Sequence, residues 1–258
     1  MRIRKYLIGT VTGLVGVMMF ASVASADVTN VQMGLQVSPA KQDKKQFGGA
    51  SVFFSSTDTH AGELPCTNAL SVSCRAFPPS TQTLLTFPTD FKFNPGKLVD
   101  CNLSQLIGQS TAGARAACQR SIVGGGSNLQ LFSDGRLLSG TITAFNGAPS
   151  GGNPSLYLHV EFPGVTTKPI LNGVIQGNRL LVQIPPVQGS VIENFSTTIS
   201  RTVVGKKKNK KTGKVTKQYY FSVRCSKRNW TGTEQVTYQN GKQLTSSVSQ
   251  KCTQRKKK

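Results

Sequence analysis

The sequence predicts an all-β protein, an antiparallel β-sandwich with one or two short helices and a disulfide-stapled loop region. Short segments with apolar residues at alternate positions recur along the chain, and turn-forming dipeptides such as Asn-Gly separate several of them. Alternation with a period of two is typical of strands that bury one face. Many short strands at regular spacing are typical of a sandwich or of a sheet that closes on itself. Six cysteines supply the means to staple the loops.

The alternation locates the individual strands. Every second residue from 31 to 37 is apolar, which predicts a half-buried first strand. In residues 155–162, Tyr157, His159 and Glu161 alternate with apolar residues, so we expect these three on a solvent-facing side of the sheet. Further strands are predicted at residues 52–54, 83–87, 129–132, 140–145, 170–174, 180–184, 191–204, 217–225, 232–238 and 244–249.

Helices and turns fill the remaining chain. Two short helices are predicted at residues 103–107 and 112–118, and either Ser110 or Thr111 is expected to cap the second. The glycines at 124–126 lack the frame of a phosphate-binding loop and are interpreted as a flexible turn. Tight turns are predicted at Asn146-Gly147, Asn172-Gly173, Gly177-Asn178 and Asn240-Gly241.

The N-terminus has the pattern of a secretory signal peptide over residues 1–26. Arg2, Arg4 and Lys5 precede an apolar run, which ends at the small-residue sequence Ala24-Ser25-Ala26. An uncleaved membrane anchor is the alternative, because the run approaches the length that spans a bilayer. No later segment is long and apolar enough for a transmembrane helix, so we expect none in the mature chain. The predicted location is secreted, either extracellular or at the cell envelope.

The mature chain is predicted to fold as one β-sandwich domain over residues 27–252, followed by a basic tail at 253–258. A boundary near residue 120, between a cysteine-containing loop region and the regular strand series, is the alternative. An even number of cysteines in an exported chain predicts disulfides, for which 15 pairings are open. We favour pairing between sequence neighbours, because two of these links would staple irregular loops: Cys66 with Cys74, Cys101 with Cys118, and Cys225 with Cys252.

No motif predicts catalysis or a cofactor. The chain has two histidines and no Cys-x-x-Cys pair, so we expect no metal site. It has no Gly-x-Ser-x-Gly sequence, and its ten acidic residues do not suggest a catalytic carboxylate pair. We therefore predict that the protein is not an enzyme. A hydrolase with a dispersed site around His159 and Glu161 is an alternative, since period two places these side chains on one face.

Charge is the most informative feature of the composition. The formal net charge is +21, and basic residues concentrate between residues 201 and 228 and after residue 250. A strand pattern on both sides of this lysine run predicts a hairpin with a solvated cationic tip, either a solubilising loop or a polyanion-binding site. Lysine rather than arginine dominates, which favours diffuse attraction over sequence-specific recognition of nucleic acid. The predicted polyanion-binding residues are Lys206, Lys207, Lys208, Lys210, Lys211, Lys214 and Lys217.

Aromatic residues suggest a second binding hypothesis. Trp230, Tyr238 and Tyr157 lie in predicted strands, where exposed rings would offer stacking surfaces for sugars, although such rings also pack in cores. The sequence thus predicts a non-catalytic secreted or envelope-associated protein that contacts anionic envelope polymers or surfaces through its lysine-rich hairpin. A carbohydrate-binding module that uses exposed aromatic residues is the alternative.

One part of the chain resembles a known set of proteins. The segment from Cys118 to three consecutive glycines at 124–126, with Cys101 before it and Phe145-Asn146-Gly147 after it, resembles secreted actinobacterial β-rich proteins of no established activity. This chain has Cys118-Gln119 where that set usually has Cys-Pro. The resemblance covers about residues 84 to 252. It implies export and a β fold, and it implies no site residues.

Overall fold

The computed structural model describes residues 27–61, 78–95, 98–132, 136–185, 187, 190–200, 202–208, 213 and 215–255. The predicted signal peptide and the predicted pair Cys66 and Cys74 lie outside these residues. The described chain is all-β with one α-helix and two short 3-10 helices, as the sequence predicts. None of the described helices has the length and hydropathy needed to cross a membrane.

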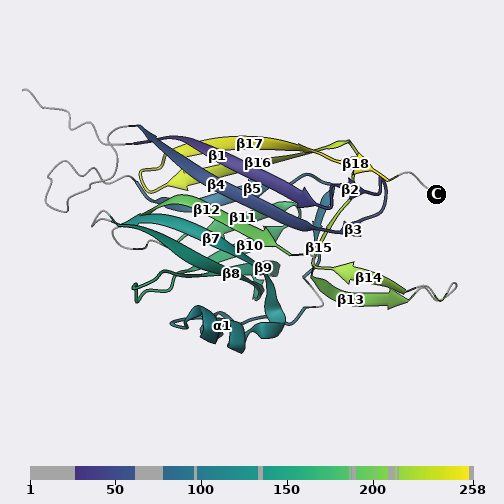
Figure 1. Ribbon diagram of the computed structural model, residues 1–258, viewed down its shortest axis with the longest axis horizontal. Coiled ribbons are helices and arrows are strands. Elements are labelled where there is room, and N and C mark those ends of the chain that lie inside the picture. Colours follow the sequence, from purple (N-terminus) through teal and green to yellow (C-terminus); the bar gives the residue numbers. More distant parts are fainter. Residues whose placement is uncertain are drawn as a thin grey trace, which may run out of the picture.

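One large antiparallel sheet dominates the fold (Figure 1). Among the described residues, eleven strands belong to this sheet, and their order in space differs from their order along the chain. In spatial order they are β1 (Asp27–Ser38), β4 (Ser51–Ala61), β12 (Ser190–Ile199), β7 (Ile122–Phe132), β8 (Leu137–Ser150), β9 (Asn153–Glu161), β10 (Ile170–Gln176), β11 (Arg179–Gln183), β5 (Ser80–Thr86), β16 (Asn229–Tyr238) and β17 (Gln243–Lys251).

The sheet curls until its first and last strands lie side by side. Figure 1 shows β1, β4, β16 and β17 as one layer and β7, β8, β9 and β10 as the facing layer. Side chains join the two edges: the Met33 amide donates to Ser246 Oγ at 3.0 Å, and the Val37 amide donates to Gln250 Oε1 at 2.6 Å. Gln250 Nε2 in turn donates a hydrogen bond to the Val37 carbonyl oxygen at 3.2 Å. Satisfying the backbone of β1 in this way limits its tendency to pair with another chain.

The interior of the curled sheet holds the main hydrophobic core. Alternate residues of each strand point inward, as the period-two pattern predicts. Aromatic rings fill one end of the core, where the Phe91 ring meets Phe221 and Trp230 edge to face with centroid distances of 5.3 and 5.5 Å. The buried Trp230 indole donates to the Arg224 carbonyl at 2.8 Å, so its one polar atom is satisfied.

Strands from both sides of residue 120 share this sheet and core. β5, which precedes residue 120, pairs with β11 and β16, both of which follow it. The connecting region carries the helices η1 (Leu103–Gln105), α1 (Thr111–Ala117) and η2 (Gln119–Ser121). Ser110 caps α1 by accepting a hydrogen bond from the Gly113 amide, which confirms one of the two predicted caps.

The helical region covers the outer face of β8 and β9, and this corrects the expected solvent-facing row. Tyr157 and His159 are buried because α1 and its flanking loop pack over them. A disulfide between Cys101 and Cys118 closes this layer, as predicted. The alternation predicts that this face of the sheet is exposed to solvent. The helical layer covers it instead and forms a second, smaller hydrophobic core.

Short strands gather at the end of the molecule that carries the C-terminus (Figure 1). A second predicted disulfide, Cys225–Cys252, is also present there. The predicted hairpin extends from this end, and the start of the predicted tail pairs in β18 with β2. The strands are β3 (Gly48–Gly49), β15 (Phe221–Val223) and β6 (Phe91–Phe93) in one sheet, β18 (Thr253–Gln254) and β2 (Lys41–Gln42) in another, and the hairpin of β13 (Val203–Lys208) and β14 (Val215–Tyr219).

Two of the four predicted turns are confirmed. Gly177 and Gly241 have positive φ in the hairpins β10–β11 and β16–β17. The dipeptides Asn146-Gly147 and Asn172-Gly173 instead lie inside β8 and β10, so those predictions are wrong. In both, the glycine serves close packing: a Cβ at Gly173, for example, would meet the Leu180 side chain.

The glycines at 124–126 are also strand residues rather than a flexible turn. They lie in β7, where a Cβ at Gly124 or Gly126 would collide with the backbone of the neighbouring strand β12. The absence of a side chain lets β12 run this close. The run of glycines is therefore a packing requirement of the sheet.

We expect Gly126→Ala to lower the free energy of unfolding by about 3 kcal/mol, because the added methyl meets backbone atoms that cannot rotate away. Gly232→Ala is the matched control, since its methyl would come closest to the flexible ends of Met33 and Leu35 and would lie at an ordinary contact distance from the Thr86 carbonyl oxygen. We expect it to cost about 1 kcal/mol or less. Urea unfolding followed by circular dichroism measures both, and equal midpoints for the two variants would contradict the packing role of Gly126.

Candidate functional site

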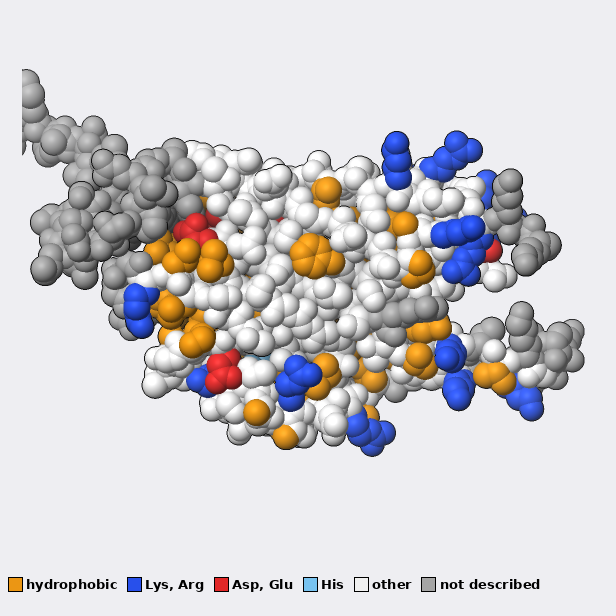
Figure 2. All heavy atoms as spheres, viewed as in Figure 1, with side chains coloured by type: hydrophobic (Ala, Val, Ile, Leu, Met, Phe, Trp, Pro, Cys, Tyr) orange, Lys and Arg blue, Asp and Glu red, His pale blue; other side chains and the backbone are white. Residues whose placement is uncertain are grey.

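The end of the molecule that carries the hairpin and the C-terminus is strongly basic. Figure 2 shows Lys and Arg side chains gathered at this end, over the elements that Figure 1 labels β2, β3, β13, β14 and β18. We call this surface the cationic end. Its described basic residues come from several separate segments: Lys41, Lys44, Lys45, Lys92, Lys206, Lys208, Lys217, Arg224, Lys227, Arg228, Lys251 and Arg255.

Acidic residues at the cationic end are engaged internally. The Asp43 carboxylate accepts from the amides of Lys45 and Gln46 at 2.7 and 2.8 Å. Asp90 is buried and accepts from Arg224 Nε at 2.9 Å and from the Ser226 amide at 2.8 Å. Burial alone would raise the pKa of Asp90, but these hydrogen bonds outweigh it and lower that pKa below its usual value. Both carboxylates thus hold the loops in place.

The described part of the hairpin places one pair of lysines opposite each other. Lys206 lies directly opposite Lys217, so both side chains project from the same face, and both are exposed. Lys208, two residues along β13, projects from that face as well and is exposed. Like charges placed opposite each other repel, and a bound anion would relieve that repulsion. Lys210, Lys211, Lys214 and the side chain of Lys207 lie outside what the structure describes.

The aromatic residues proposed as sugar platforms are buried, which corrects that hypothesis. The exposed fractions of Trp230, Tyr238 and Tyr157 are 0%, 1% and 6%. Trp230 belongs to the aromatic end of the core, and Tyr157 packs beneath α1. None of the three offers a face to a sugar.

His159 and Glu161 both anchor the helical layer. His159 is fully buried, and its Nε2 lies 2.9 Å from the Gln109 carbonyl oxygen. Glu161 accepts from the Thr111 amide at 2.5 Å and pairs with Lys168 Nζ at 3.4 Å. Hydrogen bonds from Thr111 are the main reason that the pKa of Glu161 is lowered. These contacts explain both residues as parts of the α1 attachment rather than as an acid–base pair.

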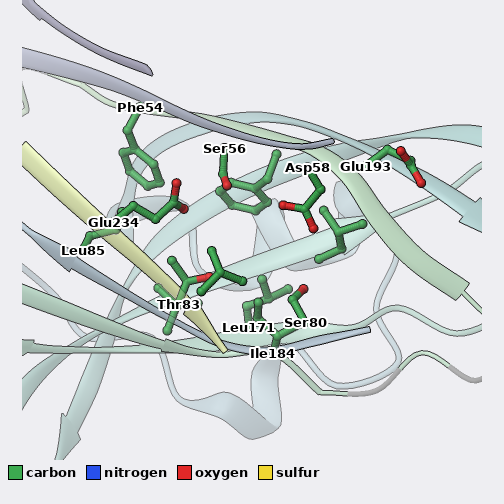
Figure 3. A pocket seen from close by; sticks show the side chains of 14 residues that line it. Phe54, Ser56, Asp58, Ser80, Thr83, Leu85, Leu171, Ile184, Glu193 and Glu234 are labelled. Atoms are coloured by element: carbon green, nitrogen blue, oxygen red, sulfur yellow. The ribbon is translucent and has the colours of Figure 1, made fainter. Parts of the chain in front are cut away.

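A pocket opens into the interior of the curled sheet, between β4, β5, β10, β11, β12 and β16 (Figure 3). It contains about 520 Å³ of empty space, part of which is open to solvent. Three acidic residues line it, namely Asp58, Glu193 and Glu234, together with Ser56 and Thr83. The rest of the wall is mainly apolar, with Phe54, Leu85, Leu171, Val182, Phe195 and Val236.

Glu234 is the unusual member of this pocket. It is 2% exposed and points from β16 toward Ser56 of β4, as Figure 3 shows. Ser56 donates a hydrogen bond to its carboxyl group, while Glu234 Oε2 has no hydrogen-bond partner among the described residues. Burial, assisted by the negative charge of Asp58, raises the pKa of Glu234 from 4.5 to about 7, and the Ser56 bond only partly opposes this.

Sequence reasoning missed this pocket, although one signal was present. Glu234 occupies an inward position of β16, in line with the buried residues Trp230, Val236 and Tyr238. An acidic residue within an inward-facing apolar series marks a buried carboxyl group. The partners Ser56 and Asp58 are far away in the sequence and meet Glu234 only because the sheet curls.

The described residues contain no cluster of three or more His, Cys, Asp or Glu side chains arranged to hold a metal ion. In comparisons with known proteins, no family model, no curated protein and no solved structure matches the chain. The cationic end and the pocket are two candidate sites that the described residues present.

We expect Glu234→Gln to remove a pH-dependent loss of stability. Because the pKa of Glu234 is higher in the folded chain, its protonated form stabilises the fold at low pH, and this contribution is lost as pH rises from 4.5 through about 7. The shift corresponds to about 3 kcal/mol. Chemical unfolding between pH 4 and pH 8 should show the variant gaining stability over the wild type across this range. A constant difference would contradict the raised pKa.

Proposed function

We propose that the protein is a secreted or envelope-associated, non-catalytic protein that docks on linear anionic polymers of the cell envelope through its cationic end. The observation that carries this proposal is the collection of basic side chains from separate segments at one end of the fold, where Asp43 and Asp90 are committed to internal hydrogen bonds. Among the described residues, the bases of the cationic end far outnumber Asp43 and Asp90, so they create a concentrated positive potential.

The residue types favour a flexible polymer as the partner. Lysines predominate over arginines on the hairpin, and lysine is a point charge that does not impose the bidentate geometry of arginine. Such a surface gains affinity by releasing counterions from a polyanion, and this affinity falls steeply with salt. Sequence-specific nucleic-acid binding is not part of the proposal, because no described element presents a set of side chains suited to base recognition.

Export is supported by the cysteine chemistry. The described part of the chain holds two disulfides, Cys101–Cys118 and Cys225–Cys252, and disulfides persist mainly in oxidising compartments. The second of them ties β15 to the C-terminal segment beside β18, so it braces the cationic end itself. The predicted signal peptide and the resemblance to secreted actinobacterial proteins agree with this location.

We expect replacement of Lys206, Lys208 and Lys217 by Gln to weaken retention on isolated cell envelopes and on dextran sulfate. The variant loses three contacts between lysines and anionic groups of the polymer. In a plot of log affinity against log salt concentration, the slope should therefore become shallower by about two. Titration of binding from low to high salt measures the slope. The matched control replaces Arg115, Arg120 and Arg179, which are exposed elsewhere, by Gln.

The control removes the same net charge, so it separates a local site from general attraction. Equal loss of binding in both triple variants would contradict docking at the cationic end. Preferential binding to anionic lipid vesicles over the soluble polymer would contradict a polymer as the partner and would indicate a membrane surface instead.

A further inference from the structure

An open groove lies on the outer face of the main sheet, at the border of the helical layer. α1 packs over β8 and β9, and the groove runs beside it over β7 and the end of β12. Its volume is about 430 Å³, which is within the range of small-molecule sites. The described residues that line it come from α1, β7, β12 and the segment after β12: Arg115, Ile122, Val123, Gly124, Gly125, Thr198, Ser200 and Thr202.

Glycine leaves the floor of this groove bare. Gly125 of β7 lies directly opposite Thr198 of β12, so both positions face the same side of the sheet. Thr198 lines the groove, and Gly125 beside it has no side chain to fill the space. Ile122 is partly buried at the edge of this floor and adds an apolar contact. A flat ring can therefore lie against the strand backbone here.

The polar side chains of the groove are not engaged by other described residues. Arg115 is exposed and makes no hydrogen bond or ion pair with them, and the same holds for the hydroxyl groups of Thr198, Ser200 and Thr202. The backbone that carries these groups is held firmly. The Ser200 amide donates to the Val123 carbonyl oxygen at 2.7 Å, and the disulfide at Cys118 anchors the end of α1. Such fixed donors favour binding, because little order has to be gained when a ligand arrives.

We propose that this groove binds a sugar acid, with the carboxylate paired to Arg115 and the ring hydroxyls bonded to the Thr and Ser side chains. A guanidinium group presents a planar fork of donors that matches the two oxygens of a carboxylate. Thr and Ser hydroxyl groups both donate and accept, as the hydroxyl groups of a sugar do. The groove thus offers a partner for each kind of polar group on such a ligand.

The charge of the groove selects among ligands. Its described lining contains one base, Arg115, and no acidic residue, so it matches a single negative charge. Arg115 would repel a cationic ligand, and a ligand with several negative charges would exceed the one cation present. An apolar ligand would remove water from the guanidinium group without replacing its hydrogen bonds. A monoanion that carries hydroxyl groups meets all of these conditions.

Two pairs of sugars provide the probes, namely glucuronate with glucose and galacturonate with galactose. The members of each pair share a ring and differ in the carboxylate. For the chain without its predicted signal peptide, we expect at least one acid to bind with a Kd of about 1 mM or below, and its neutral partner to bind at least about tenfold more weakly. Chemical shifts of the Ile122 and Val123 methyl groups report occupancy of the groove.

Two results of this titration would overturn the proposal. One is that neither acid binds at a concentration of about 10 mM, where a ligand of the expected affinity would occupy most of the sites. The other is that a neutral sugar binds as tightly as its acid, because the carboxylate would then contribute nothing.

Variants locate the carboxylate. We expect Arg115→Gln to weaken binding of the acid about tenfold or more, since a charged hydrogen bond is lost. Arg120→Gln is the matched control, because Arg120 is exposed on the neighbouring η2 and is not among the described residues that line the groove. It should leave the affinity unchanged. Equal effects of the two variants would overturn the assignment to Arg115.

A second pair of variants locates the ring hydroxyls. Thr198→Val keeps the shape of the side chain and removes its hydroxyl group, so we expect binding to weaken by about threefold to tenfold. Thr233→Val makes the same change on the outer face of β16 and should have no effect. Unchanged binding in Thr198→Val would contradict the placement of the sugar ring beside β12.

The groove and the cationic end can be tested separately, because they involve different residues. The variant with Lys206, Lys208 and Lys217 replaced by Gln should keep its affinity for the sugar acid. If it loses this affinity together with retention on dextran sulfate, general attraction of anions explains both results, and the assignment to the groove is wrong. If retention is lost and the sugar acid still binds, the groove is a distinct site.

Discussion

The contact between the two edges of the main sheet is the constraint on which the rest of the structure depends. Among the described residues, β1 and β17 are the outermost strands, and Ser246 and Gln250 join them through hydrogen bonds to the backbone of Met33 and Val37. An open sheet of this size would leave its inner face in water. Curling buries that face against itself and forms one interior, which contains the aromatic core and the pocket.

The two ends of this interior differ in chemistry because different segments close them. At one end, short strands, a disulfide and the hairpin bring basic residues together, while Asp43 and Asp90 brace the loops. Farther along the interior, β4, β12 and β16 place Asp58, Glu193 and Glu234 around a space that the core side chains do not fill. The fold thus separates a surface rich in basic residues from a pocket lined by three acidic residues.

The sequence predicts local structure here better than it predicts burial. Alternation located most strands, and sequence proximity paired Cys101 with Cys118 and Cys225 with Cys252 correctly. Alternation reports two faces but not what covers them, so His159 was expected in solvent although α1 buries it. The lysine hairpin was predictable because its signal lies within one short segment. The contact of Ser56 with Glu234 depends instead on pairings between strands that are distant in the sequence, such as β5 with β16, and no local pattern specifies these pairings.

Amide hydrogen exchange at β1 tests the closure of the sheet most directly. The Met33 and Val37 amides donate to side chains of β17 at the neighbouring edge. If the sheet is closed in solution, these two amides exchange slowly, at rates comparable to those of amides in the strand ladders. If they exchange as fast as amides of an exposed edge strand while the ladder amides stay protected, the sheet is open and the account of its interior is wrong.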